Sequence, residues 1–180
     1  LDSSHMTVAY GGQPRMLTTG LNINDLNEEG RLKVLQSLKD GIDEAYEMGA
    51  VGFAFLSGKY EEDRKEEAYQ ALLKSTRELC AYAKSKGNLK VVLEIFDYDI
   101  DKKSLIGPSK LAKRFAEDVR EEYDNFGLMV DLSHIPLLRE TCEAKLAKKP
   151  SCPLKTTWFM HTWETPLLKI LAVLLMGIPT

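Results

Sequence analysis

The fold of this chain is decided by residues 89–96, which read LKVVLEIF. The apolar residues of this stretch are nearly continuous, as expected of a strand that is covered on both faces. After Lys90 at its start, the exception is Glu94, close to the carboxyl end of the stretch. A buried carboxylate without a partner costs on the order of several kcal/mol. We therefore expect Glu94 to have a partner, and in βα folds this edge of the sheet builds the active site.

A second stretch of the same kind is NFGLMVDL at residues 125–132. Asp131 interrupts it near its carboxyl end, and His134 follows three residues later. If the two stretches are neighbouring parallel strands, Glu94 and Asp131 point to the same edge, where a shared divalent cation would partner both. His134 is placed to ligate that metal or to hydrogen-bond a substrate hydroxyl. The alternative is that each carboxylate is a helix cap or a salt-bridge partner.

Around these stretches, short apolar runs alternate with long amphipathic ones. The pattern predicts strands at residues 6–10 and 50–55, and helices at residues 28–48, 61–85 and 108–123. This alternation is typical of parallel βα units, which form either an open doubly wound sheet or a barrel. Neither GxGxxG nor GxxxxGK[ST] follows a predicted strand, which argues against dinucleotide-binding and P-loop proteins.

The helix predicted at residues 28–48 has Asn24 and Asp25 as candidate N-caps. Its apolar residues recur at steps of three and four, which predicts one buried face. The residues of that face are Leu32, Leu35, Leu38, Ile42 and Ala45.

Composition excludes several classes of protein. The 180 residues are 28% charged and 44% hydrophobic, with a formal net charge of −3, as in an ordinary globular domain. Lys and Arg are interspersed with acidic residues, so neither nucleic acid nor a membrane is the expected partner. Three cysteines without a CxxC motif favour reduced thiols and a cytoplasmic location. Residues 1–6, LDSSHM, are either native chain or a cloning remnant.

Two segments of the chain resemble a known family. VVLEIFDYDIDKKSLIGP at residues 91–108 and NFGLMVDLSHIP at residues 125–136 look like the sugar phosphate isomerase/epimerase group of xylose-isomerase-like TIM barrels. The resemblance implies a (β/α)₈ barrel with a divalent metal, often Mn²⁺ or Mg²⁺, and a sugar or sugar phosphate as small-molecule substrate. It also implies that Glu94 is the first metal ligand and a catalytic residue, that Asp131 is the second ligand, and that His134 contacts the substrate.

The chain departs from the family in length and in ligands. A complete barrel of this kind needs about 250 residues. The fold expected here is therefore α/β, a partial (β/α)₈ TIM barrel of about four parallel βα units in residues 1–145. The family's third ligand, in a motif like His-x-His-x-Gly-Asn, and its fourth, a late glutamate, are absent from the sequence.

Residues 146–180 form an apolar tail of a different character. If its codons are read one base earlier, each new codon joins the last base of one codon to the first two bases of the next. Because tryptophan has a single codon, Trp158 followed by Phe159 must then give valine, and Trp163 followed by Glu164 must give glycine. With permitted third bases elsewhere, the shifted frame contains His-Ala-His-Met-Gly-Asn, where the third-ligand strand of the family belongs. We interpret the tail as an out-of-frame translation. As it stands, its longest apolar run is interrupted by Lys169 and is shorter than the roughly 18–20 residues of a membrane span.

The predicted function is that of a fragment of a divalent-metal-dependent sugar or sugar-phosphate isomerase/epimerase, itself inactive because two metal ligands are missing. The alternative is a non-catalytic α/β interaction domain in which Glu94 and Asp131 are structural. The sequence leaves open which sugar is bound, whether it is phosphorylated, which metal serves, and whether the chain forms an oligomer.

Overall fold

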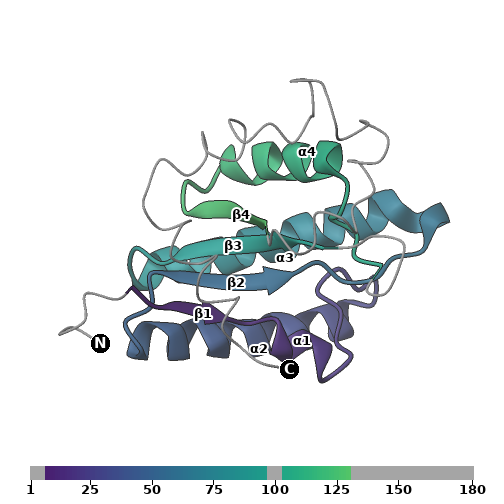
Figure 1. Ribbon diagram of the computed structural model, residues 1–180. Coiled ribbons are helices and arrows are strands. Elements are labelled where there is room, and N and C mark those ends of the chain that lie inside the picture. The colour runs from purple at the N-terminus through teal and green to yellow at the C-terminus, as the bar shows by residue number, and fades with distance from the viewer. Residues whose placement is uncertain (1–6, 97–102, 131–180) are drawn as a thin grey trace, which may run out of the picture.

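The computed structural model describes residues 7–96 and 103–130. In this part of the chain, four parallel strands form one sheet in the order β1-β2-β3-β4 (Figure 1). The strands are β1 (Ala9–Gly11), β2 (Gly52–Leu56), β3 (Lys90–Ile95) and β4 (Phe126–Val130).

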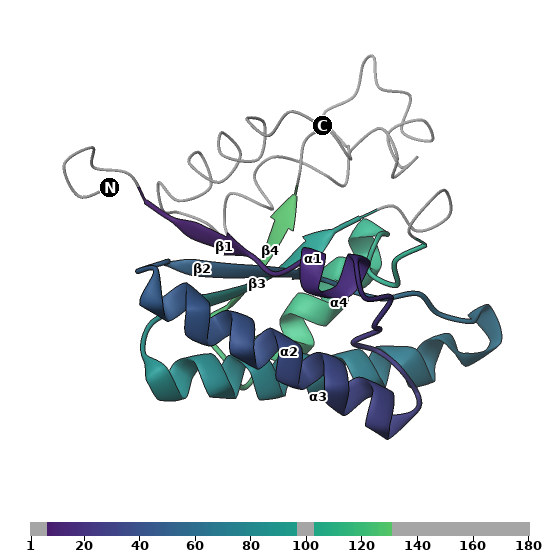
Figure 2. The same cartoon turned by 90° about the horizontal axis from the view of Figure 1, so that it is seen from below.

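Helices connect the strands. They are α1 (Pro14–Leu17), α2 (Glu28–Glu47), α3 (Lys65–Lys86), which follows the 3₁₀ helix η2 (Glu62–Arg64), and α4 (Ser109–Arg120). The three long helices α2, α3 and α4 all lie on one face of the sheet (Figure 2). None of the helices in the described ranges is long and apolar enough to cross a membrane.

Strand order and helix placement together decide between the two architectures that the alternation of strands and helices left open. A doubly wound sheet reverses its strand order and carries helices on both faces. Here the strands follow chain order, and every long connection returns over the same face. This is the arrangement of consecutive βα units in a barrel wall, so the predicted partial TIM barrel is confirmed.

The two faces of the sheet differ because successive side chains of a strand point in opposite directions. On the side that we call the helix face, strand side chains join the helices in one large core: Phe53, Phe55, Val91, Leu93, Ile95, Phe126 and Leu128. On the opposite side, which we call the inner face, a small separate cluster contains Ala54, Val92 and Met129, with Ala9 packed against it.

The start of α2 differs from the prediction. Its N-cap is Asn27, whose side chain accepts hydrogen bonds from the backbone N–H groups of Glu29 and Gly30 at 2.9 and 3.3 Å. The predicted caps were Asn24 and Asp25, and both are wrong. Asn24 is instead buried, and its side chain joins two loops after β1 and β2.

The predicted buried face of α2 is correct except at Leu32, which is 46% exposed. Its neighbour Arg31 is buried instead, with its side chain only 2% exposed. Arg31 forms ion pairs with Glu28 and Glu78 and donates a hydrogen bond to Ser75 of α3. Apolar spacing alone could not reveal this, because burial of the arginine depends on acceptors supplied by a second helix.

Candidate functional site

Glu94 lies at the carboxyl end of β3 and is buried, with 5% of its surface exposed. Its register partners are Leu56 on β2 and Met129 on β4. Val92, two residues earlier, belongs to the inner cluster. Because side chains alternate along a strand, the Glu94 carboxylate therefore projects from the inner face. The expected position at the carboxyl edge of the sheet is confirmed for this residue.

Glu94 has a partner from a distant part of the chain. The side-chain Nε2 of Gln13 donates a hydrogen bond to Oε2 of Glu94 at 2.9 Å. Gln13 follows β1, whereas Glu94 is the second-last residue of β3, so β2 lies between the strands that supply the two residues. The amide restricts the orientation of the carboxylate.

Local structure explains how Gln13 reaches this position. The backbone N–H of Gly12 donates to the carbonyl of Ala54 at 2.7 Å, which extends the pairing of β1 with β2 by one residue. A Cβ atom on Gly12 would lie 2.5 Å from Cζ of Phe53 and 2.8 Å from the Ala54 carbonyl oxygen, so only glycine fits. Pro14 then begins α1, since proline suits the first turn of a helix.

Sequence reasoning missed Gln13. It lies in the run GGQP at residues 11–14, just after the first predicted strand. Its position gave a signal, because Gln13 lies two residues after β1, and polar residues at the carboxyl edge of a parallel sheet are all candidates for the site.

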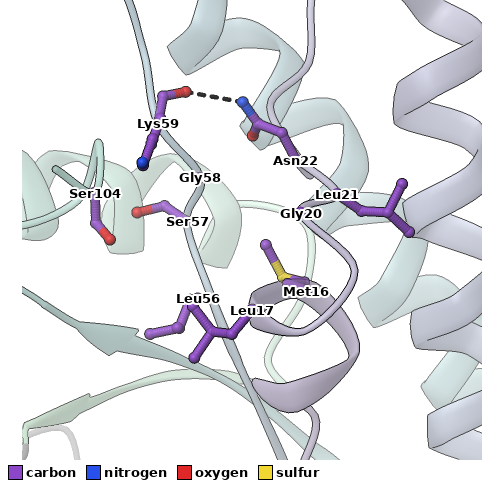
Figure 3. Close-up of a pocket in the computed structure, with 10 residues that line it drawn as sticks. All are labelled: Met16, Leu17, Gly20, Leu21, Asn22, Leu56, Ser57, Gly58, Lys59 and Ser104. Atoms are coloured by element: carbon purple, nitrogen blue, oxygen red, sulfur yellow. Dashed lines mark hydrogen bonds between the residues drawn. The ribbon is translucent and has the colours of Figure 1, made fainter. Parts of the chain in front are cut away.

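A cavity of about 360 Å³ lies at the carboxyl end of β2 (Figure 3). Leu56 lines it and is also the register partner of Glu94, so the cavity and the carboxylate are neighbours at one edge of the sheet. No residue of the cavity was proposed from the sequence. The lining residues are Met16, Leu17, Gly20, Leu21, Asn22, Leu56, Ser57, Gly58, Lys59 and Ser104.

The other two predicted site residues, Asp131 and His134, lie outside the described residues, as does the tail at residues 146–180. Their convergence with Glu94 stays a prediction. Within residues 7–96 and 103–130, no three His, Cys, Asp or Glu side chains gather closely enough to hold a metal ion. Glu94 fits a divalent ion in one respect, because it offers a carboxylate oxygen of the kind that Mn²⁺ and Mg²⁺ bind.

Comparison with known proteins decides the family. A family model described as the xylose isomerase-like TIM barrel matches residues 3–149. The chain belongs to this family. The match includes all four strands described above and the positions of Glu94, Asp131 and His134.

Two solved structures are similar to this xylose isomerase-like chain. A D-tagatose 3-epimerase-like protein has a TM-score of 0.62 at 18% identity, over 74% of this chain and 48% of that one. An AP endonuclease of family 2 from Brucella melitensis has a TM-score of 0.58 at 12% identity, over 88% of this chain and 67% of that one. The chain thus spans about half the length of the epimerase-like protein. At these sequence identities the likeness to the two solved structures shows the fold alone. A search of curated proteins finds no match.

Proposed function

We propose that this chain is part of a divalent-metal-dependent sugar or sugar-phosphate isomerase/epimerase. The observation that carries the proposal is the buried carboxylate of Glu94 on the inner face of a partial TIM barrel, at the carboxyl edge of the sheet. Enzymes of this fold build their active sites at that edge. The family match supports the proposal, because the isomerases that give the family its name act on sugars.

Each residue has a role in the proposed reaction. Glu94 and Asp131 would hold Mn²⁺ or Mg²⁺, and Gln13 would fix the orientation of the Glu94 carboxylate through its hydrogen bond to Oε2. A bound divalent ion supplies polarisation of the substrate oxygens. Glu94 would also move a proton at the carbon next to a carbonyl. His134 would hydrogen-bond a substrate hydroxyl.

We further propose that the 180-residue chain is itself inactive, because its sequence lacks the third and fourth ligands of the family. The out-of-frame interpretation of residues 146–180 accounts for the missing third ligand. It is supported by the family match, which ends at residue 149. The nucleotide sequence of codons 140–156 tests it: a one-base slip is expected there, and an uninterrupted natural frame would refute it.

Activity tests the proposed function. The chain as given should show no sugar epimerisation above background with Mn²⁺ present. A chain with the frame restored and extended to barrel length should epimerise a ketose. Replacing a metal ligand in it by Glu94→Gln or Asp131→Asn should lower the rate by about 100-fold, within the range seen when metal sites are disturbed.

The matched control is Glu29→Gln, which changes an exposed glutamate at the start of α2. It should leave the rate unchanged. Mn²⁺ affinity, measured by calorimetry on the same extended variants, separates the proposal from the interaction-domain alternative. If Glu94→Gln and Glu29→Gln bind Mn²⁺ equally well, Glu94 is structural and the proposed site is wrong.

A further inference from the structure

Gln13 stands at the start of a very short helix. Its carbonyl accepts hydrogen bonds from the backbone N–H groups of Met16 and Leu17 at 3.1 and 3.0 Å. The helix α1 has only four residues, and a single helical turn has little stability of its own, because few hydrogen bonds offset the entropy of fixing its backbone. Met16 anchors α1 in the core, with 4% of its surface exposed. The position of Gln13 therefore depends on what else holds this helix.

Arg15 supplies a further anchor for α1. The helix lies beside α2 (Figure 1), and the guanidinium group of Arg15 joins the two. Its Nη2 forms an ion pair with Oε1 of Glu44 at 2.6 Å, and its Nη1 donates to the carbonyl of Ser37 at 3.1 Å. The Nε and Nη2 atoms also donate to the hydroxyl of Tyr10 on β1, at 3.3 and 3.2 Å. One side chain thus attaches α1 to a long helix and to the sheet.

Tyr10, Arg15 and Glu44 form a closed set of contacts, which we call the arginine cluster. The hydroxyl of Tyr10 accepts from Arg15 and donates to Oε2 of Glu44 at 2.5 Å, while Arg15 pairs with Oε1 of the same carboxylate. The ring of Tyr10 stacks on Phe53, with the ring centroids 5.6 Å apart. An isolated ion pair at the surface contributes little to stability, but this one is fixed by an aromatic ring that packs on the core.

The helix α2 makes room for the guanidinium group at Gly41. A Cβ atom on Gly41 would lie 2.8 Å from Nε of Arg15 and 3.0 Å from Cε2 of Phe53. Glycine inside a helix is less favourable than alanine, so the benefit of Gly41 is the close approach of Arg15 to α2. The approach leaves the Arg15 side chain only 24% exposed, although it carries a full charge.

We propose that Arg15 is a positioning residue for the Glu94 carboxylate and that it acts through Gln13. The proposal rests on the proposed function for the role of Glu94 and adds the side chains that hold its partner in place. The backbone N–H of Arg15 donates to the carbonyl of Gly12 at 3.1 Å, so Gln13 lies inside a turn that moves with α1. Arg15 contacts Tyr10 on the helix face, whereas Nε2 of Gln13 donates to Oε2 of Glu94 at 2.9 Å.

Hydrogen exchange of the Gln13 side-chain amide tests the proposal on the 180-residue chain, without metal or activity. The chain has three glutamines, and the exposed Gln36 and Gln70 serve as internal references in the same NMR spectrum. Arg15→Met should accelerate the exchange at Gln13 by at least about 3-fold, since one hydrogen bond contributes about this factor. Tyr10→Phe removes only the hydroxyl and keeps the stacked ring, so it should act in the same direction with the fold intact. Unchanged exchange at Gln13 in both variants would overturn the proposal.

The matched control is Arg77→Met, on α3. Arg77 forms an ion pair with Glu122 at 3.0 Å and donates to the carbonyl of Asp118 at 3.0 Å, so it joins two elements as Arg15 does. Its side chain is 31% exposed, close to the 24% of Arg15. Arg77→Met should leave the exchange at Gln13 as in the parent chain. Equal acceleration by Arg77→Met and Arg15→Met would indicate general loosening of the fold, and the proposal would be wrong.

Mn²⁺ affinity of the frame-restored, extended chain separates positioning from simple stabilisation. Gln13→Ala should weaken Mn²⁺ binding about 10-fold, the lower end of the loss seen when the partner of a metal-binding side chain is removed. Arg15→Met should weaken it about 3-fold in the parent chain, but less than about 1.5-fold when Gln13 is already alanine, because the effect passes through the Gln13 amide. Full additivity of the two substitutions would refute the proposal.

Failure of this proposal can be distinguished from failure of the proposed function. If Glu94→Gln leaves the Mn²⁺ affinity unchanged while Arg15→Met still accelerates the exchange at Gln13, the proposed function is wrong and the positioning of Gln13 by Arg15 stands. If Glu94→Gln weakens Mn²⁺ binding but Arg15→Met changes neither the exchange nor the affinity, the metal site stands and Arg15 is not a positioning residue.

Discussion

The helix face and the inner face of the sheet are built by the same four strands, yet they present different side chains. The helix face presents large aromatic and branched side chains, among them Phe53 and Phe126, which are 0% and 1% exposed. The inner face presents smaller residues such as Gly52 and Ala54, and at its carboxyl edge the carboxylate Glu94. The two-residue period of a strand thus separates the large core side chains from the carboxylate that we propose as a metal ligand.

The substitution that should lower the free energy of unfolding most lies on the helix face. Phe53→Ala should lower the free energy of unfolding by about 3–5 kcal/mol, because it removes a buried ring that stacks on Tyr10 and leaves a cavity in the main core. Urea denaturation followed by circular dichroism measures this. Leu32→Ala is the control, since Leu32 is exposed and should cost less than about 0.5 kcal/mol. Similar losses for both variants would contradict the assigned core.

A smaller loss of stability is expected for a substitution where β1 ends and the loop that carries Gln13 begins. Gly12→Ala should lower the free energy of unfolding by about 1–3 kcal/mol, because the added methyl group meets Phe53 and a backbone oxygen that cannot move aside. Gly20→Ala is an informative comparison. Gly20 has open space around it but a φ of +67°, so its cost reflects backbone strain and not a clash. A neutral Gly12→Ala would show that this turn is looser than described.

A still smaller effect on stability is expected on the inner face. Glu94→Gln should change the free energy of unfolding by less than about 1 kcal/mol, because the new amide oxygen can still accept from Gln13 while the cost of burying a charge disappears. The denaturation assay used for Phe53→Ala applies. A loss of more than about 3 kcal/mol would favour a structural role for Glu94 and would weaken the separation between the two faces.

The smallest effect on stability is expected for Glu28, at the outer surface of the helix layer. Hydrogen bonds from Arg31 and then Lys74 lower the pKa of Glu28 from 4.5 to about 2. Since the pKa of Glu28 is lower in the folded than in the unfolded state, its interactions with Arg31 and Lys74 stabilise the fold above about pH 4.5. This contribution to stability is lost as the pH falls toward about 2. The stability difference between the parent chain and Glu28→Gln should therefore shrink from about pH 6 to about pH 2, and salt should weaken it. A stability difference that stays constant over this pH range would contradict the pairing of Glu28 with Arg31 and Lys74.

Element order and the position of one buried carboxylate could be predicted from local patterns in the chain. The four strands and three long helices were predicted within a few residues of their observed positions, and Glu94 was singled out because it interrupts an apolar strand. These inferences succeed because hydrophobic periodicity and a buried charge are properties of a short segment, whatever it packs against. The N-cap of α2 and the exposure of Leu32 were predicted wrongly, because Asn24 and Arg31 have partners on distant elements.

Two features were decided only by the tertiary structure: the contact of Gln13 with Glu94, and the cavity beside them. The barrel-type sheet, in place of a doubly wound one, was predicted from the family resemblance and not from the βα pattern. The side on which a helix returns over the sheet is set by how whole elements pack, and no local pattern records it. Gln13 and Glu94 are 81 residues apart, and they meet only because β1 and β3 are both paired with β2. The cavity likewise combines the loops after β1, after β2 and before α4, which only the folded chain brings together at one edge of the sheet.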